Sequence, residues 1–277
     1  MYKYHDEKEE HLHELDGKPL IGTSTVVGVI AKPLTWWASG LAVAELGWIK
    51  KIDTREHPTE DQIFKNLEDR EKASALAKDK IAHMSYEDFQ KLLDSAYAAH
   101  SKSLKKSAGK GTDMHQLLED YIKVCISVNE GAPMGSNGNG GDPVDIFSTW
   151  ALKNVKRFIL SEGHCYSEKL WVGGITDCVA QLLNGNFVII DFKSSKEAYL
   201  SQFIQVAGYD IEITENGLFD ADGNSIEFIL GTRISAYIIF PFGADKVFPQ
   251  VKTNVKELRQ AFEAAVVLHK TINVNES

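Results

Sequence analysis

The stretch GITDCVAQLLNGNFVIIDFK, residues 174–193, predicts two strands joined by a turn at residues 184–186. Side chains of a strand alternate between the two faces of a sheet, so the length of the turn decides which residues share a face. A two-residue turn would place Asp177 and Asp191 on opposite faces. In that register the two carboxylates could not act together on one ligand.

A three-residue loop gives a register in which the charged side chains come together. Asp177 then pairs with Lys193, and Asp191 lies diagonally across on the same face. The opposite face becomes wholly apolar, which suits a sheet packed under helices. That apolar set comprises Cys178, Ala180, Leu182, Val188, Ile190 and Phe192. The hydrophobic pattern and the charge placement therefore both favour the three-residue loop.

Two aspartates and a lysine on otherwise apolar strands are costly to bury unless a compensating charge is present. Carboxylate oxygens bind hard divalent cations such as Mg²⁺ or Mn²⁺, which keep positions open for water and for a phosphate oxygen. A cation held by Asp177 and Asp191 would activate water for phosphodiester hydrolysis, and Lys193 would orient the nucleophile or neutralise the phosphate. The alternative interpretation is an isolated salt bridge between Lys193 and one aspartate.

The segments around this stretch predict an α/β fold with a central mixed sheet flanked by helices. Further strands are expected at 165–172 and 235–240, and helices at 143–160, 199–214 and 254–272. Helix-forming sequence also dominates residues 34–128, after a strand-rich start at 15–30. We therefore expect an N-terminal hairpin and helical region, residues 1–110, packed on a core formed by residues 111–277.

Composition bounds the class of protein. The chain has 277 residues, 43% hydrophobic composition and a formal net charge of −9. No run approaches the roughly 18 apolar residues of a membrane span, and the polar N-terminus lacks an export signal. We therefore expect no membrane association and a cytoplasmic location. Three widely spaced cysteines, Cys125, Cys165 and Cys178, predict neither a disulfide framework nor a four-cysteine metal cluster.

The negative net charge argues against a protein that coats DNA, since binding to the DNA backbone depends on lysine and arginine. A local basic track is nevertheless present ahead of a predicted helix, at Lys102, Lys105, Lys106 and Lys110. This track would guide a phosphate backbone toward the site, or it is a solvated linker. The sequence leaves both interpretations open.

Two predicted helices carry polar side chains in positions that fit the same site. His115 and Glu119 lie one turn apart beside the apolar stripe of one helix. Gln202, Gln205 and Tyr209 lie at positions i, i+3 and i+7 of the other. Taken alone, a histidine at the boundary of a core is usually structural, and such polar positions usually form a solvated face.

Taken in order, these residues resemble the RecB-like branch of the PD-(D/E)xK nucleases. That branch carries G-x-x-x-H on an upstream helix with a glutamate four residues beyond, followed by G-x-x-D, D-x-K and Q-x-x-x-Y. The matching residues here are Gly111 to His115, Glu119, Gly174 to Asp177, Asp191 to Lys193 and Gln205 to Tyr209. The resemblance spans about residues 111–240 and implies a restriction-endonuclease-like core.

The resemblance also implies roles for individual residues. The expected metal ligands are His115, Asp177, Asp191 and the backbone carbonyl of Phe192. The expected catalytic residues are Asp177, Asp191, Lys193, Gln205 and Tyr209, of which the last two would support the active site and contact the DNA backbone. The expected substrate contacts are Ser194, Ser195, Lys196 and Gln202. Glu119 and Glu168 are further candidates.

The implied function is an exonuclease, dependent on Mg²⁺ or Mn²⁺, that hydrolyses DNA ends, including single-stranded ends, in replication, repair or recombination. The expected partners are DNA and a recombination or single-strand-binding protein. Without a four-cysteine cluster, the chain is similar to cluster-free exonucleases of phage and mitochondrial genome-maintenance type. The alternative is a non-catalytic DNA-binding or assembly module, which would keep the fold but lack a carboxylate or the lysine. None of these residues is missing here.

Overall fold

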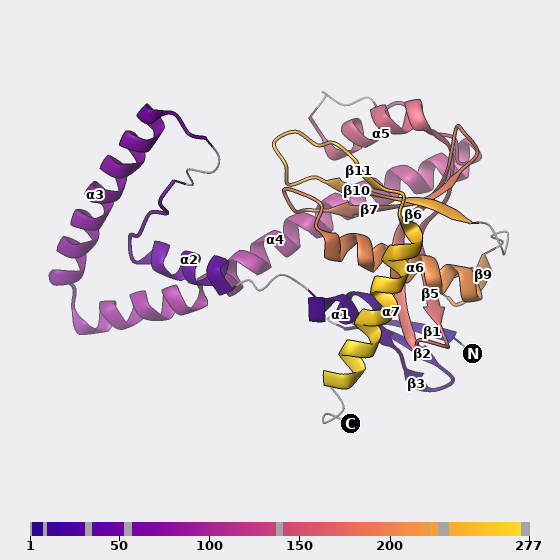
Figure 1. Ribbon diagram of the computed structural model, residues 1–277, viewed down its shortest axis with the longest axis horizontal. Coiled ribbons are helices and arrows are strands. Elements are labelled where there is room, and N and C mark those ends of the chain that lie inside the picture. Colours follow the sequence, from indigo (N-terminus) through magenta and orange to yellow (C-terminus); the bar gives the residue numbers. More distant parts are fainter. Residues whose placement is uncertain are drawn as a thin grey trace. The chain divides into compact units, whose positions relative to one another are not determined.

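A computed structural model of the chain divides it into two compact units (Figure 1). The structure describes residues 2–7, 10–30, 35–52, 57–136, 141–220, 222–226 and 233–272. One unit comprises residues 1–31 together with 110–277, and the other comprises residues 32–109. The first 31 residues therefore belong to the unit of the predicted core, whereas the sequence placed them with the helical region.

The larger unit is built around a mixed sheet, as predicted. Its strands are β4 (Ile21–Gly22), β5 (Val155–Ser167), β6 (Val172–Leu182), β7 (Phe187–Lys193), β8 (Leu218–Phe219), β9 (Ser225–Ile226), β10 (Ile234–Pro241) and β11 (Gln250–Lys252). They follow the order β11-β10-β7-β6-β5-β8-β9, with β4 beside β6. β10 pairs with β7 and β4 with β6 in parallel, while the other described pairs are antiparallel.

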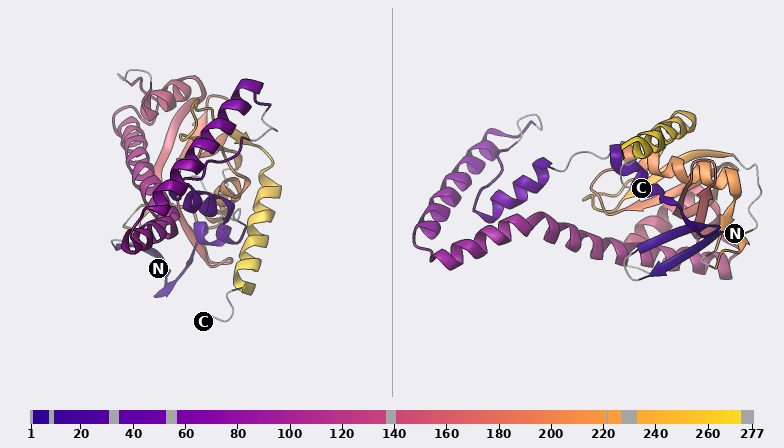
Figure 2. Two further views of the ribbon diagram at one scale, coloured as in Figure 1. Left: turned by 90° about the vertical axis from the view of Figure 1, so that its left-hand side faces the viewer. Right: turned by 90° about the horizontal axis from the view of Figure 1, so that it is seen from below.

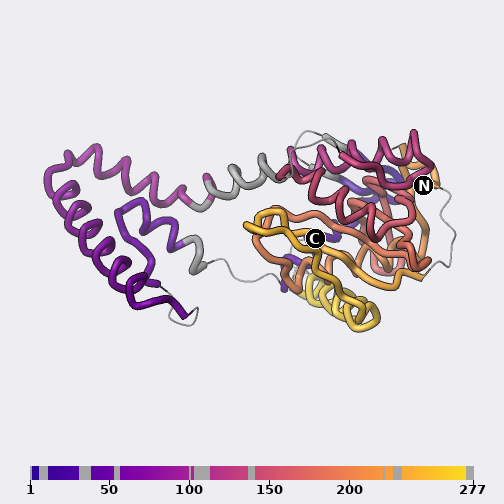
Figure 3. The backbone as a smooth tube through the Cα atoms, turned by 90° about the horizontal axis from the view of Figure 1, so that it is seen from above, coloured from indigo at the N-terminus to yellow at the C-terminus, as the bar shows by residue number. Residues whose placement is uncertain are grey.

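Helices cover both faces of this sheet. α1 (Thr23–Val27), α6 (Leu200–Asn216) and α7 (Val255–Ile272) pack on one face, over a core that includes Val179 and Ile189. The C-terminal part of α4 (Tyr86–Val128) and α5 (Pro143–Asn154) pack on the other. Figures 2 and 3 show the sheet between these two helix layers. No helix in the described part of the chain is both long and apolar enough to cross a membrane.

The register of β6 and β7 keeps the predicted faces but not the predicted partners. Cys178 pairs with Ile190 and Gln181 with Phe187, and residues 183–185 form the connecting loop. The strands are therefore shifted by two residues from the predicted pairing, and a shift of two leaves every side chain on its face. Of the predicted apolar set, five residues are buried under α4 and α5, and Leu182 is partly buried against them.

Two segments differ from the sequence expectations. The helix expected over residues 143–160 ends at Asn154, and residues 155–160 instead begin β5, which pairs along its length with β6. Such pairing overrides a local helical pattern. The strand-rich stretch expected over 15–30 is partly helical, because the chain turns into α1 directly after β4. Ahead of it, β1 (Tyr2–Glu7), β2 (Glu10–Leu15) and β3 (Lys18–Pro19) form a separate antiparallel sheet.

The smaller unit is helical, as the sequence predicts for this region. It contains α2 (Thr35–Glu45), α3 (Glu60–Ala82) and the first part of α4. α3 begins with a capping box, in which the Thr59 hydroxyl accepts from the Gln62 backbone N–H and the Gln62 side chain accepts from the Thr59 N–H. The side chains of residues 103–112, which include most of the lysine track and Gly111, lie outside the described residues.

A buried polar cluster ties α1 to α6. The Thr23 hydroxyl donates to Glu212 Oε1, and the Cys165 thiol donates to Glu212 Oε2 at 3.2 Å. Glu212 is fully buried, and this burial raises the pKa of its carboxyl group to about 8. The folded protein therefore holds a proton on Glu212 at neutral pH that the unfolded chain releases.

This proton makes stability depend on pH. Wild-type stability should fall as pH rises from about 4.5, where an unfolded glutamate ionises, to about 8, where folded Glu212 ionises. Glu212→Gln removes the titration, so we expect it to match the wild type near pH 4.5 and to exceed it by about 2–4 kcal/mol at pH 8.5. Urea unfolding across this range measures the difference, with exposed Glu263→Gln as the control. Equal pH slopes for wild type and Glu212→Gln would contradict the assignment.

Candidate functional site

The site forms where β7 parts from β6. β4 pairs with β6 at Val172 and Gly173, and β7 pairs with it only from Cys178 onward. Along this edge, residues 174–177 of β6 lie between the two neighbours and face no paired strand among those described. At the fork, Asp177 Oδ2 accepts a hydrogen bond of 2.7 Å from the Phe192 backbone N–H. The side chain thus takes the place of a backbone partner that the diverging strands no longer supply.

Three carboxylates stand in a row across three strands. On β5, Ser161 pairs with Cys178 and Gly163 with Thr176, so Glu162 lies opposite Asp177. Extending the β6–β7 register by one residue places Asp191 on the other side of Asp177. The sequence expected Lys193 at this position, and the two-residue shift puts Asp191 there instead.

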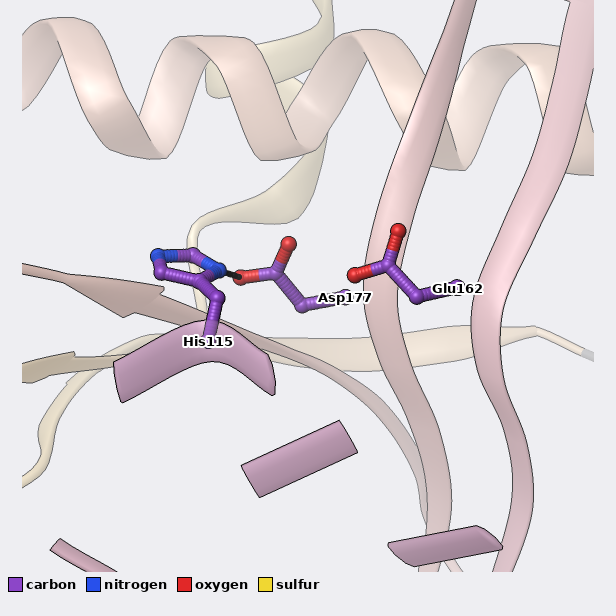
Figure 4. Close-up of side chains that lie close together, drawn as sticks. All are labelled: His115, Glu162 and Asp177. Carbon is purple, nitrogen blue, oxygen red and sulfur yellow. Dashed lines mark ion pairs between the residues drawn. The ribbon is translucent and has the colours of Figure 1, made fainter. Parts of the chain in front are cut away.

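His115 reaches the row from α4. Its Nδ1 lies 3.6 Å from Asp177 Oδ2. His115, Glu162 and Asp177 each offer one ligand atom, and these atoms lie within 4.8 Å of one another. Figure 4 shows the imidazole facing Asp177, with the Glu162 carboxylate beside it on the neighbouring strand. Such a spacing allows all three to bind one ion.

Asp191 and Lys193 form the inner part of the site. Asp191 is 1% exposed, and its Oδ1 and Oδ2 lie 3.1 and 2.8 Å from Lys193 Nζ. Burial raises the pKa of Asp191, although the Lys193 ammonium opposes this effect. Burial lowers the pKa of Lys193, but the Asp191 and Asp177 carboxylates outweigh it, and the net pKa is raised. Lys193 therefore stays charged at neutral pH.

The cluster carries more negative than positive charge. Burial and the neighbouring carboxylates of Asp177 and Glu119 raise the pKa of Glu162 to about 8. Glu119 is itself ion-paired with Lys123 one turn along α4. Asp191 Oδ2 is buried, and its contact in the described part of the chain is the Lys193 ion pair rather than a well-directed hydrogen bond. Repulsion between carboxylates and an incompletely satisfied oxygen are what a bound divalent cation would relieve.

The backbone of Phe192 has the orientation that the resemblance implied. Its N–H donates to Asp177, and in an antiparallel pair the N–H and carbonyl of one residue face the same neighbour. The Phe192 carbonyl therefore faces the side of β6 on which Asp177 lies. The Phe192 ring is 2% exposed and packs in the core beneath α4 and α5.

α6 brings Gln205 and Tyr209 toward the site. Gln205 Nε2 donates to the Tyr209 hydroxyl at 2.6 Å. A Cβ added at Gly174 would lie 2.5 Å from the Tyr209 ring, so β6 and α6 can approach this closely only because that residue is glycine. Burial, Asp191 and Asp177 raise the pKa of Tyr209 well above its ordinary value. Tyr209 is thus a neutral hydroxyl that accepts from Gln205 and keeps its own proton to donate.

The predicted substrate contacts follow β7 directly. Gln202 caps α6, because its Oε1 accepts from the Tyr199 N–H at 2.8 Å, and its Nε2 donates to Ser195 Oγ at 3.2 Å. Ser195 Oγ in turn donates to the Glu197 carbonyl at 2.8 Å. Gln202 therefore orders the loop after the site, with its amide already engaged. Ser194 and Lys196 are exposed on that loop, where a DNA backbone could reach them.

Glu168 is not brought to the site. It is exposed in the turn between β5 and β6, six residues beyond Glu162, which is about 20 Å along an extended strand. Glu162 is the glutamate of β5 that faces the site, and the sequence analysis did not single it out. Two register shifts in β5 break the alternation that identifies a strand, so the run Phe158 to Leu160 ahead of Gly163 was the remaining signal.

No protein-family model matches this chain, and no curated protein matches it. The geometry of the site therefore carries the functional argument.

Proposed function

We propose that this chain is a divalent-metal-dependent deoxyribonuclease with a restriction-endonuclease-like core, acting as an exonuclease on DNA ends. The observation that carries the proposal is the convergence of Asp177, Asp191 and Lys193 at the fork between β6 and β7, with His115 joining from α4. These four residues come from three elements far apart in the sequence. A structural ion pair would need only two of them.

The donor set fits Mg²⁺ or Mn²⁺. His115, Glu162, Asp177, Asp191 and the Phe192 carbonyl are the groups that would hold the ion. When bound, such a cation polarises a phosphate oxygen and lowers the pKa of a coordinated water. Carboxylates at this density also explain why the chain needs no overall positive charge, because only the local site has to receive a phosphate.

The chain's own residues supply the remaining chemistry. Lys193 places a permanent positive charge beside Asp191, where it would neutralise charge developing on the scissile phosphate. Tyr209 presents a neutral hydroxyl whose lone pair is already occupied by Gln205, so it would donate its proton to a phosphate oxygen. Ser194 and Lys196 extend the phosphate-binding surface beyond β7.

The proposal is tested with end-labelled single- and double-stranded DNA, and with circular DNA as a substrate without ends. We expect Mg²⁺ or Mn²⁺ to support degradation of the linear forms, chelator to stop it, and Asp177→Asn to lower the rate at least about 1,000-fold. Asp120→Asn, an exposed aspartate on α4, is the matched control and should retain wild-type activity. Cleavage of circular DNA would replace the exonuclease by an endonuclease. DNA binding without any cleavage would favour a non-catalytic DNA-binding or assembly module.

A further inference from the structure

The N-terminal segment places Thr23 behind the site. β4 pairs with β6 through Ile21 and Gly22, opposite Val172 and Gly173, and the chain then turns into α1. Thr23, the first residue of that helix, is 1% exposed. It therefore lies next to the part of β6 that leads into Asp177.

Two glycines make room for Thr23. A Cβ at Gly174 of β6 would lie 2.9 Å from Thr23 Oγ1 and 2.5 Å from the Tyr209 ring. A Cβ at Gly208 of α6 would lie 2.7 Å from Thr23 Cγ2. Thr23 thus occupies a slot between β6 and α6, and Tyr209 packs against the same glycine of β6.

The Thr23 hydroxyl fixes this arrangement. It donates to the fully buried carboxyl group of Glu212, which lies on α6 one turn after Tyr209. The Cys165 thiol of β5 bonds to the other oxygen of Glu212, and it also lies 3.5 Å from the Gly174 carbonyl oxygen. α1, α6, β5 and β6 are thereby joined at one point, directly behind Tyr209.

We propose that Thr23 is a positioning residue of the nuclease site, which holds Tyr209 against β6 three residues before Asp177; this inference rests on the proposed function. Its hydroxyl is the part that matters, because it connects α1 to the helix that carries Tyr209. On this view, the N-terminal 31 residues are part of the catalytic unit. A residue that merely stabilised the fold would change the melting temperature without changing turnover below it.

The test compares Thr23→Val, which keeps the shape and loses the hydroxyl, with Thr23→Ser, which keeps the hydroxyl. Because valine preserves the packing of the slot, the variant should fold. We expect Thr23→Val to lower kcat about 10-fold while KM and Mn²⁺ affinity stay within about twofold of the wild type. Thr23→Ser should retain at least about half of the wild-type kcat. Thr25→Val, at an exposed position of the same helix, is the control.

A double variant shows whether the effect passes through Tyr209. If it does, Thr23→Val combined with Tyr209→Ala should be no slower than Tyr209→Ala alone. Wild-type kcat in Thr23→Val, or a multiplicative loss in the double variant, would overturn the inference and leave the nuclease proposal standing. An inactive wild type would overturn both. Equal kcat losses in Thr23→Val and Thr25→Val would also overturn it, since the loss would then not depend on the slot.

Discussion

Asp191→Asn should lose both Mn²⁺ binding and DNA cleavage, the latter by at least about 1,000-fold, whereas Lys193→Met should lose cleavage and keep most of the Mn²⁺ binding. Asp191 is a buried carboxylate beside Asp177, so its charge is needed for a cation to be held between them. Lys193 is a cation itself and cannot be a ligand. Removing it leaves the Asp191 carboxylate without its ion-pair partner, and a bound metal would supply the missing positive charge.

Titration calorimetry with Mn²⁺ separates the two residues, because it requires no turnover. Circular dichroism confirms that each variant is folded. The exposed residues Asp222 and Lys169 provide matched controls as Asp222→Asn and Lys169→Met, both expected to bind Mn²⁺ and cleave DNA like the wild type. If Asp191→Asn and Lys193→Met lost Mn²⁺ affinity equally, the division between a ligand and a charge-neutralising residue would be wrong.

The faces of β6 and β7 could be predicted from the sequence, although their exact pairing could not. Both the predicted and the observed register place Asp177, Asp191 and Lys193 on one face, because the two differ by an even number of residues. Apolar alternation fixes parity but is blind to a shift of two. The turn decides the remaining choice, and here Gly185 donates to the Leu182 carbonyl, which closes the loop two residues earlier along the pair.

Glu162 could not be predicted by the same reasoning, because β5 is irregular. Its register with β6 shifts twice before it reaches Ser161, and Glu162 itself has a φ of 54°, which few non-glycine residues adopt. A strand with bulges does not alternate cleanly, so its apolar pattern resembles a helix. Bulges of this kind often aim a side chain at a functional site. The local irregularity that concealed Glu162 in the sequence is thus part of what directs it to Asp177.

The place of the N-terminal segment could not be predicted either, since nothing local marks it. Thr23 is one of many small polar residues in the sequence, and its role depends on Gly174 and Gly208, which are about 150 and 185 positions away. A contact of this range leaves no periodic signal. Only the packing of β4 beside β6 reveals that the first 31 residues belong to the unit that carries the site.

Glu162→Gln should lower the cleavage rate about 100-fold, while Glu168→Gln should leave it within about twofold of the wild type. The two glutamates lie on β5 and on the turn after it, and the resemblance pointed to Glu168. The structure places Glu162 within ligand distance of His115 and Asp177, and Glu168 in the exposed turn at the far end of the strand. The same conservative substitution at both positions therefore tests the geometry against the motif.

Stability should change in the opposite direction to activity at Glu162. Without a cation, its carboxyl group is buried beside Asp177 and Glu119, which is why its pKa is raised to about 8. Glu162→Gln keeps the shape and removes this repulsion, so the metal-free variant should melt above the metal-free wild type at pH 8.5, and Mn²⁺ should stabilise it less. Thermal melting with and without Mn²⁺ measures both effects. A variant that cleaves normally, or that melts below the wild type without metal, would show that Glu162 is an ordinary structural residue, because only a group kept for binding a cation costs stability when the cation is absent.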